Sequence, residues 1–389
     1  MTENTVKILD IKISTLDNQK IRNQVYKYLK GRQRHQIVTP NPEFLLSSLK
    51  DDEFYYILNN ASLSVPDGIG LKFASWLNGG NIKRMAGSDL MQDILAYAHS
   101  DNMPVAVLNW SKGLSSNQEI SNAIKNKYPK IKLLIQSAER DKDIDLDKIK
   151  KFAPAVLLCS LGAPYQDKVI FKLLPQLPSA RLGMGIGGSF DFMTGKLRRA
   201  PVLMRSLGLE WIWRLILQPR KRFKRIYNAF IIFSWTVFKV KYINRFFYRK
   251  NVIGFLFKDK QVLILNSNKV DEDYWGLPQG GIDKGESEIN TIKREIKEET
   301  NTDNFKILKQ YNNIYKYDWP KNYGIMGYRG QKQTLFILKY FGKKDDIKIS
   351  LEHKDFRWVD INKLIDEADP IHRGSYELFV QKYYNNKYV

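Results

Sequence analysis

Cysteine is nearly absent from this sequence, and it shows no sign of a secretory leader. The single cysteine among 389 residues is Cys159. One thiol cannot build a disulfide framework or a cysteine-based metal site. Cys159 lies in the apolar run AVLLCSLGAP, so we expect it to be buried in a strand. The first residues, MTENTVKILDIKIS, lack the charged and apolar regions of a signal peptide, so we expect a cytoplasmic location.

Acidic residues are missing from one segment, residues 211–250, which contains eleven lysines and arginines. These cations equal half of the net charge of +22, which itself indicates an anionic partner. The apolar run inside the segment, residues 226–238, is too short to span roughly 30 Å of hydrocarbon. Aromatic residues flanked by cations favour a helix lying on the inner face of an anionic membrane. A core helix with a solvated basic edge is the alternative.

The length of the chain and its composition predict two folded domains. A hydrophobic content of 43% with 13% aromatic residues excludes a disordered chain, and 389 residues suffice for two cores. The basic segment separates them. We therefore expect a catalytic core over residues 1–210, a membrane-associating appendage and linker over 211–249, and a second domain over 250–389.

The first domain alternates strand and helix patterns. Apolar stretches at 104–110, 130–136 and 155–162 are typical of strands, and the first two flank an amphipathic helix that begins near two serines. This rhythm predicts a Rossmann-like α/β fold, in which a parallel sheet carries helices on its faces. Binding sites in such folds lie beyond the carboxyl ends of the strands.

Three loops of this domain carry residues suited to binding. VTPNPEF contains Thr39 and Asn41, VPDGIGLKFA contains Asp67, and GMGIGGSFDF contains several glycines. Glycine lets a backbone approach a phosphate closely. However, the glycine spacing is not that of the dinucleotide-binding fingerprint. The residues alone therefore leave nucleotide binding open.

Several motifs spread over residues 5–245 resemble the WecG/TagA/CpsF glycosyltransferase family. They are TPNPEFL, PDGIGL, RMAGSDLM, LGAPYQD, GIGGSFDFMTGKLRRAP and GLEWIWRLILQPRKRFKR, in the family's order. The resemblance implies inverting transfer of an N-acetylmannosamine-type sugar from a UDP donor to a polyprenyl-diphosphate-linked sugar, at the cytosolic membrane surface. Because no Asp-x-Asp motif stands where a diphosphate would need one, we expect this domain to need no metal.

The resemblance also assigns candidate site residues. Asp67 matches the proposed catalytic base, which would take the proton of the acceptor hydroxyl. The other matches are Thr39 and Asn41 in the pocket, Arg84 and Asp89 in the donor pocket or its support, Gln166 in a turn, and Arg214, Arg220 and Arg225 in the appendage. Guanidinium groups suit a diphosphate leaving group, although attraction to a lipid surface is an alternative for these arginines.

One position departs from the family pattern. The family usually has glycines after the strand at 104–108, and this chain has Asn109 and Trp110 there. We expect the tryptophan to reshape the donor site.

The second domain contains a complete Nudix box between residues 280 and 299. The box consists of Gly280, Glu286, Arg294, Glu295, Glu298 and Glu299. Beyond Ser287 the stretch lacks glycine and proline, so it predicts a helix on which the last three glutamates share one face. Crowded carboxylates repel one another unless a hard cation lies among them, which favours Mg²⁺ or Mn²⁺. Arg294 would hold Glu286 or a neighbouring carboxylate in place. A solvated acidic helix face is the alternative.

Within the Nudix hydrolases, residues 250–385 resemble RNA pyrophosphohydrolase and dinucleoside polyphosphate hydrolases. The motifs are WGLPQGGIDKGES, GQKQTLFIL and EHKDFRWVD. The resemblance implies an α/β/α sandwich that hydrolyses a phosphoanhydride. Glu352 matches a further metal-binding or catalytic glutamate, and Gln279, Gln331 and Gln333 are candidate substrate ligands. The branch usually has an arginine pair before its tryptophan; here Lys269 stands with Asp271, Glu272 and Asp273, which favours a small nucleotide over a long RNA.

Three functions remain open from the sequence. The first is a bifunctional enzyme that combines sugar transfer with hydrolysis of 5′-triphosphate RNA or dinucleoside polyphosphates. The second is a transferase whose Nudix domain hydrolyses a nucleotide-sugar or only binds nucleotide as a regulatory module. The third is a membrane-recruited RNA-processing enzyme whose first domain is a scaffold.

Overall fold

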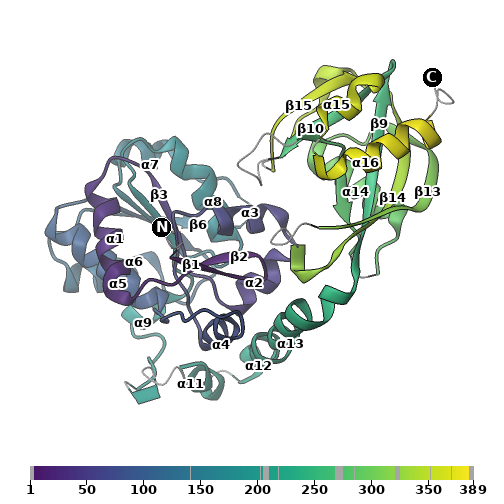
Figure 1. The fold of residues 1–389 in the computed structure, drawn as a ribbon. Coiled ribbons are helices and arrows are strands. Elements are labelled where there is room, and N and C mark those ends of the chain that lie inside the picture. Colours follow the sequence, from purple (N-terminus) through teal and green to yellow (C-terminus); the bar gives the residue numbers. More distant parts are fainter. Residues whose placement is uncertain are drawn as a thin grey trace. The chain divides into compact units, whose positions relative to one another are not determined.

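Two units make up the chain, Met1–Val237 and Phe238–Val389, and each is described separately (Figure 1). The computed structural model describes residues 4–140, 142–201, 203–204, 210–217, 219–267, 275–283, 285–319, 325–350, 352–368 and 370–384. The stretch with Lys269 and the three acids that follow it lies outside the described residues.

The first unit is built on a six-stranded parallel sheet with strand order β4-β3-β8-β7-β5-β6. A two-stranded antiparallel hairpin, β1-β2, precedes it. The strands expected near 104–110, 130–136 and 155–162 are all present, so the predicted Rossmann-like sheet is confirmed. The strand bounds are β1 Thr5–Ile8, β2 Ile11–Ser14, β3 His35–Val38, β4 Leu63–Ser64, β5 Val105–Trp110, β6 Leu133–Ala138, β7 Val156–Cys159 and β8 Leu182–Gly185.

Helices cover both faces of this sheet. Ile37 and Val107 pack with residues of α1, α5 and α6, whereas Leu157 and Cys159 pack with residues of α7 and α8 on the opposite face. Cys159 is fully buried, as predicted, and burial raises the pKa of its thiol to about 12. The helices are α1 Asn18–Lys30, α2 Pro42–Ser48, α3 Asp52–Asn60, α4 Ile69–Leu77, α5 Gly87–Ser100, α6 Asn117–Lys127, α7 Leu146–Phe152, α8 Tyr165–Leu173 and α9 Ser189–Met193.

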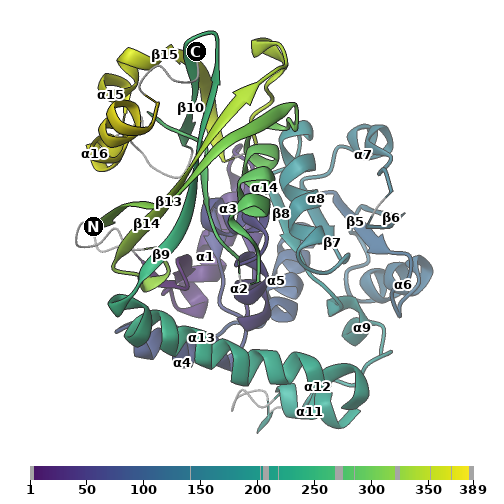
Figure 2. The same ribbon diagram turned by 90° about the vertical axis from the view of Figure 1, so that its right-hand side faces the viewer.

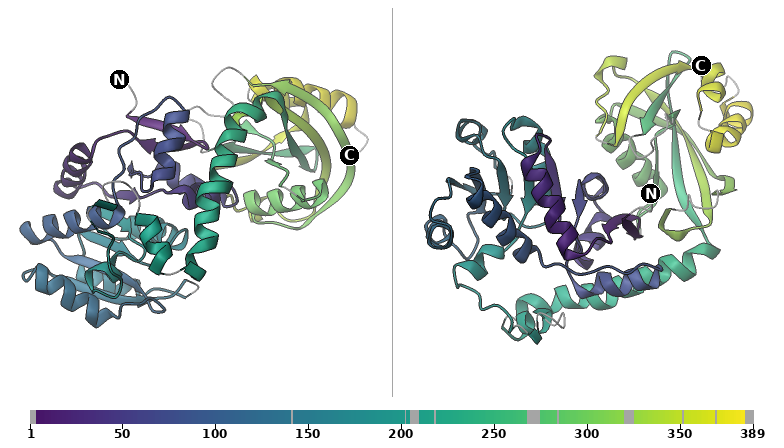
Figure 3. Two further views of the ribbon diagram at one scale, coloured as in Figure 1. Left: turned by 90° about the horizontal axis from the view of Figure 1, so that it is seen from below. Right: turned by 60° about the vertical axis from the view of Figure 1, so that its left-hand side comes forward.

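The basic segment is helical, as its sequence predicts. It contains α11 (Glu210–Leu217), α12 (Pro219–Tyr227) and α13 (Phe233–Phe238), with π-helical turns joining and extending them (Figure 3). Phe223, Ile231 and Trp235 are more than half exposed, which is unusual for large apolar side chains and fits contact with an apolar phase. None of the helices among the described residues is long and apolar enough to cross a membrane.

The second unit has a seven-stranded mixed sheet, and its central strands β9 and β14 are parallel. The path runs β11-β10-β9-β14-β13, with β12 paired to β9 and β15 paired to β10. A two-residue turn at 259–260 separates β9 from β10. The strand bounds are β9 Tyr248–Lys258, β10 Gln261–Ser267, β11 Trp275–Gly276, β12 Gln279–Gly281, β13 Phe305–Asp318, β14 Gly330–Tyr340 and β15 His353–Asp360.

One helix covers one face of the second sheet, and two cover the other, which confirms the predicted α/β/α sandwich (Figure 2). They are α14 Glu288–Thr300, α15 Leu364–Glu367 and α16 Pro370–Leu378. Ile292 of α14 packs with Leu338, and Tyr376 of α16 packs with Phe255 from the opposite face. The Nudix-box helix begins as predicted, because the Ser287 side chain caps it.

Candidate active sites

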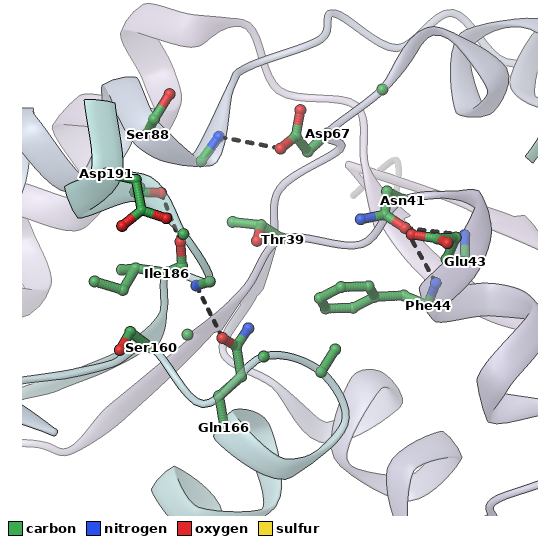
Figure 4. A pocket seen from close by; sticks show the side chains of 18 of the residues that line it. Thr39, Asn41, Glu43, Phe44, Asp67, Ser88, Ser160, Gln166, Ile186 and Asp191 are labelled. Carbon is green, nitrogen blue, oxygen red and sulfur yellow. Dashed lines mark hydrogen bonds between the residues drawn. The ribbon is translucent and has the colours of Figure 1, made fainter. Parts of the chain in front are cut away.

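A cavity of about 890 Å³ lies in the first unit, at the carboxyl ends of its parallel strands (Figure 4). The loops after all six strands of the sheet contribute to its wall, as the topology of a parallel sheet dictates. Six residues predicted from the sequence to form the site line the cavity together. They are Thr39, Asn41, Asp67, Arg84, Gln166 and Arg225.

Asp67 lies between a helix N-terminus and a guanidinium. Its Oδ2 accepts a long hydrogen bond of 3.4 Å from the backbone N–H of Gly87, the first residue of α5. Its Oδ1 is 3.7 Å from Nε of Arg84. Both neighbours favour the ionised carboxylate, and the side chain remains one-third exposed. The backbone N–H of Asp67 also donates to the carbonyl of Pro40, which ties this loop to the loop after β3.

Two predicted amides shape the cavity from within. Oδ1 of Asn41 caps α2 by accepting hydrogen bonds from the N–H groups of Glu43 and Phe44. Oε1 of Gln166 accepts a 2.9 Å hydrogen bond from the N–H of Gly187 and so holds the glycine-rich turn (Figure 4). A Cβ on Gly185 would lie only 2.3 Å from Nε2 of Gln166, so glycine is required at that position.

The basic helices form one wall of the same cavity. Glu210, the first residue of α11, accepts a 3.1 Å hydrogen bond from Arg84. Arg225 of α12 binds both carboxylate oxygens of Glu43. The sequence analysis gave no role to Glu43 or Glu210, although Glu43 lies inside the quoted motif TPNPEFL.

Three of the predicted residues are not among the described side chains that line the cavity. Asp89 forms an ion pair with Arg199 at 2.5 Å, which ties α5 to the segment after α9. Arg220 is exposed on α12. The backbone of Arg214 lies in α11, and its side chain is outside the described part of the chain. Of the two roles considered for Asp89, this geometry fits support of the pocket.

Asp167 is a buried carboxyl group that the sequence analysis did not single out. It follows the cavity-lining Gln166 in α8 and is fully inaccessible to solvent. Burial raises the pKa of Asp167 to about 7, against a smaller lowering by the Gln166 side chain. A carboxyl in such a place is held in its neutral form in acid and near-neutral solution.

In the second unit the Nudix-box glutamates cluster around one arginine. Arg294 donates to Glu286, Glu295 and Glu298 at 2.8–3.1 Å. Glu286, held by these bonds, has a lowered pKa. Burial alone would lower the pKa of Arg294, but its hydrogen bond to Glu286 and the charges of Glu295 and Glu298 more than reverse this and raise it.

Gly280 lets the central carboxylate approach the backbone. A Cβ at this position would lie 1.8 Å from the carboxylate carbon of Glu295. Glu295 and Glu299 are each only 8% exposed, whereas the Glu298 side chain is about half exposed. Glu299 accepts from the N–H of Gln279 and lies 3.3 Å from Nε2 of His353. The cluster therefore has two buried carboxylates and one open to a ligand.

The cluster carries more negative than positive charge, so its side chains are of the type that bind a divalent cation. One guanidinium faces three of the four box glutamates, and carboxylate oxygens are the ligands that Mg²⁺ and Mn²⁺ prefer. In the described residues, no three acidic, histidine or cysteine side chains already converge in the manner of a metal-binding group. Glu352 directly precedes His353, so the chain brings this predicted ligand near the end of α14.

The predicted glutamines lie at a second, mostly neutral cluster. Gln279 bonds to Asn251 at 3.0 Å and to His372 at 2.8 Å, and Gln331 accepts from the hydroxyl of Tyr317 at 2.7 Å. Gln333, two positions along β14, is fully buried. Asn251 pairs with Gln333 in the sheet register. The sequence analysis missed Asn251, Tyr317 and His372, because they come from separate strands and a helix.

An aromatic and cationic cluster also lines the cavity of the first unit. The guanidinium of Arg140 lies 4.5 Å from the ring centre of Trp110 and 4.8 Å from that of Tyr165. The sequence analysis expected Trp110 to affect the donor site but had no signal for Arg140, which lies 30 residues away in the sequence.

Comparisons with known proteins match each unit separately. The Glycosyl transferase WecG/TagA/CpsF family model matches residues 6–246, and the NUDIX domain model matches residues 247–379. An N-acetylglucosaminyldiphosphoundecaprenol N-acetyl-β-D-mannosaminyltransferase of Bacillus subtilis is 31% identical over 55% of this chain and 83% of its own length. An RNA pyrophosphohydrolase of Pelagibacter ubique is 32% identical over 30% of this chain and 80% of its own length.

Solved structures were also compared with the chain. The dihydroneopterin triphosphate pyrophosphohydrolase of E. coli aligns with 34% of this chain and 97% of its own, at 19% identity and a TM-score of 0.28. The family matches of the two units, which divide the chain at residues 246 and 247, carry the assignment. The chain belongs to the WecG/TagA/CpsF family of glycosyltransferases and joins that domain to a Nudix hydrolase domain, which makes it a bifunctional enzyme.

Proposed function

We propose that the first unit transfers an N-acetylmannosamine-type sugar from a UDP donor to a polyprenyl-diphosphate-linked N-acetylglucosamine, with inversion. The main support is the position of Asp67, an accessible carboxylate in the wall of a cavity of about 890 Å³ at the carboxyl ends of the strands. The name of the relative from Bacillus subtilis gives an N-acetylmannosaminyl group and an N-acetylglucosaminyldiphosphoundecaprenol acceptor, which supports the choice of sugar and acceptor.

Asp67 acts as the general base in this proposal. It takes the proton of the acceptor hydroxyl while that oxygen bonds to the anomeric carbon of the donor sugar. The bond between the anomeric carbon and the diphosphate breaks, and UDP leaves with the electron pair. Nε of Arg84 lies 3.7 Å from Oδ1 of Asp67, and an inverting transfer needs one carboxylate near the acceptor hydroxyl.

We propose that the second unit hydrolyses a phosphoanhydride in 5′-triphosphate RNA or a dinucleoside polyphosphate. Nudix hydrolases generally depend on a divalent metal ion, and here Glu295, Glu298 and Glu299, with Glu352, would hold Mg²⁺ or Mn²⁺. The metal would activate water and neutralise charge on the leaving group. The cluster of Gln279, Gln331 and Gln333, with its amide donors and acceptors, suits the polar edges of a nucleotide.

A nucleotide-sugar is the second candidate substrate for the Nudix unit. The observation that favours it is the fusion itself, because a hydrolase joined to a sugar transferase would meet nucleotide-sugars and their products.

One experiment tests both activities on the full chain. Asp67→Asn and Glu298→Gln are each assayed for sugar transfer and for hydrolysis of triphosphate RNA, diadenosine tetraphosphate and UDP-sugars. We expect each variant to lose one activity, by about a hundredfold to ten-thousandfold, and to keep the other. Exposed acids, Asp143→Asn and Glu377→Gln, are the matched controls. Transfer that survives in Asp67→Asn would remove this residue as the base, and hydrolysis confined to UDP-sugars would replace the RNA-type substrate.

We also propose that residues 211–249 attach the chain to the inner face of the cell membrane. The support is a set of exposed apolar side chains in a segment with ten cations and no acidic residue. The test is flotation of the full chain with anionic vesicles. Phe223→Ser should weaken flotation, whereas Phe341→Ser, at another phenylalanine that is more than half exposed and lies in the second unit, should not. Equal flotation of both variants would contradict the proposal.

A further inference from the structure

One helix of the parallel-sheet core, α4, carries large aromatic side chains that the first unit leaves open to solvent. Leu71, Ala74 and Ser75 face the core and are buried. On the other side of the helix, Phe73 is 49% exposed and Trp76 is 70% exposed. The centres of these two rings lie 6.2 Å apart, so the side chains form one apolar surface. Neighbouring exposed aromatic residues indicate a surface that meets a partner.

This helix lies beside the basic segment. A Cβ on Gly70 of α4 would lie 3.8 Å from a ring carbon of Phe233, and Figure 1 and Figure 2 both show α4 next to α13. Phe73 follows Gly70 by one helical turn, so it lies near this contact. Trp76 and Trp235, one on each of these helices, are the two tryptophans whose described side chains are more than half exposed. The exposed aromatic residues of α4 therefore extend those of the basic segment into the core.

The charge around α4 suits an anionic surface. Residues 68–88, which include all of α4, contain Lys72, Lys83 and Arg84 but no aspartate or glutamate. Lys72 is exposed and precedes Trp76 by four positions, a spacing that puts both side chains on one face of a helix. A tryptophan beside a lysine fits the interface of an anionic leaflet, because the ring enters the headgroup region while the ammonium group stays among the lipid phosphates.

The same helix begins at the candidate active site. Gly68, the residue before α4, directly follows Asp67, and Gly68, Ile69 and Gly70 line the cavity. The nine residues of α4 span roughly 14 Å. A bilayer that took up Trp76 near the end of α4 would therefore lie close to the cavity.

We propose that α4 is a second membrane-contacting element, which belongs to the parallel-sheet core and not to the basic segment. Phe73 and Trp76 enter the interface of an anionic leaflet, and Lys72 meets the headgroups. Together with the basic segment, α4 holds the cavity at the bilayer surface, where the sugar of a lipid-linked acceptor reaches Asp67. This inference rests on the proposed membrane attachment and adds which side of the cavity faces the lipid.

The first test measures the affinity of the full chain for vesicles of phosphatidylglycerol and phosphatidylcholine, by flotation over a series of lipid concentrations. We expect Phe73→Ser and Trp76→Ser each to weaken binding by about tenfold, because each removes a large apolar side chain from the interface. Trp76→Phe keeps a ring and should retain most of the affinity, which guards against misfolding of the serine variant. Tyr26→Ser, at an exposed aromatic residue of α1, is the matched control and should leave the affinity unchanged.

The second test asks whether α4 itself touches the lipid. Cys159 is fully buried, and burial raises the pKa of its thiol to about 12. A cysteine introduced at an exposed position can therefore be labelled selectively. A polarity-sensitive fluorophore on Trp76→Cys should shift its emission to shorter wavelength when vesicles are added at saturating lipid. The same label on Tyr26→Cys should not shift.

Three results would overturn the inference, and they are distinguishable. If the chain floats but the label at position 76 stays in water, or if both serine variants float like the parent, α4 is not a membrane contact and attachment through the basic segment stands. An emission shift that needs no vesicles and grows with protein concentration would mean that a second copy of the chain covers α4. If the parent chain does not float at all, the proposed membrane attachment fails, and the inference fails with it.

Discussion

In each unit an arginine lies among carboxylates, but the ratio of positive to negative side chains differs between the two sites. In the first unit Arg84 is shared by Asp67 and Glu210, and other cations line the same cavity. In the second unit Arg294 contacts Glu286, Glu295 and Glu298, and Glu299 lies close by. We therefore expect the near-balanced site to work with the protein's own charges, and the acidic site to need an added cation to bind a phosphorylated substrate.

Metal removal is the largest effect expected from this difference. Treatment of the full chain with EDTA should reduce Nudix hydrolysis to background, because the glutamates then repel the phosphates of the substrate. Sugar transfer should continue at its untreated rate. Both rates are measured on one preparation, and added Mg²⁺ should restore hydrolysis. A parallel loss of transfer would show that the first unit also depends on a metal, and the comparison would fail.

A smaller effect is expected from the glycine beneath the acidic cluster. Gly280→Ala places a Cβ within 1.8 Å of the Glu295 carboxylate, which must move. Because misplacement of a catalytic group by about 1 Å can cost roughly a hundredfold in rate, hydrolysis should fall by about that factor. Gly31→Ala, where the nearest atom would be 3.4 Å away, is the control. Undiminished hydrolysis in Gly280→Ala would mean that the position of Glu295 is not critical.

The smallest effect concerns the stability of the first unit and Asp167. Its folded pKa is about 7, above the ordinary value of 3.8. The folded chain therefore keeps a proton between these pH values that the unfolded chain has lost, so stability falls as pH rises from about 4 to about 7. Each pKa unit corresponds to about 1.4 kcal/mol.

Asp167→Asn should remove this part of the pH dependence. The measurement is the Tm of the full chain at pH 5 and pH 8, compared with that of the exposed control Asp147→Asn. The decrease in Tm from pH 5 to pH 8 should be smaller in Asp167→Asn than in the control. An equal decrease in both variants would show that Asp167 is ionised in the folded chain.

Local sequence patterns predicted the helices and strands, and the site residues that lie within recognisable sequence motifs. The capped start of α14 and the alternation of strands and helices in the first unit follow from short-range rules, since caps and periodicity act within a few positions. The positions of Asp67 and Gln166 on one cavity were predicted only through the family resemblance.

Long-range partners could not be predicted. Glu210 is 126 residues from Arg84, and Glu43 is 182 residues from Arg225. The sequence around Arg84 or Arg225 does not indicate which glutamate each will contact. These ion pairs form only when the basic helices pack beside the cavity. Arg140 was missed for the same reason: its partners, Trp110 and Tyr165, follow different strands.

The bond between Arg84 and Glu210 links the strength of the base to the presence of the basic helices. Glu210 begins α11, and it draws part of the guanidinium's charge away from Asp67. A chain cut before α11 would remove the Glu210 carboxylate from Arg84, and a cation whose charge is less compensated makes a neighbouring carboxylate a weaker proton acceptor. The helices that begin with α11 would therefore raise the rate of proton transfer. Their removal would slow that step even when the acceptor is supplied without a membrane.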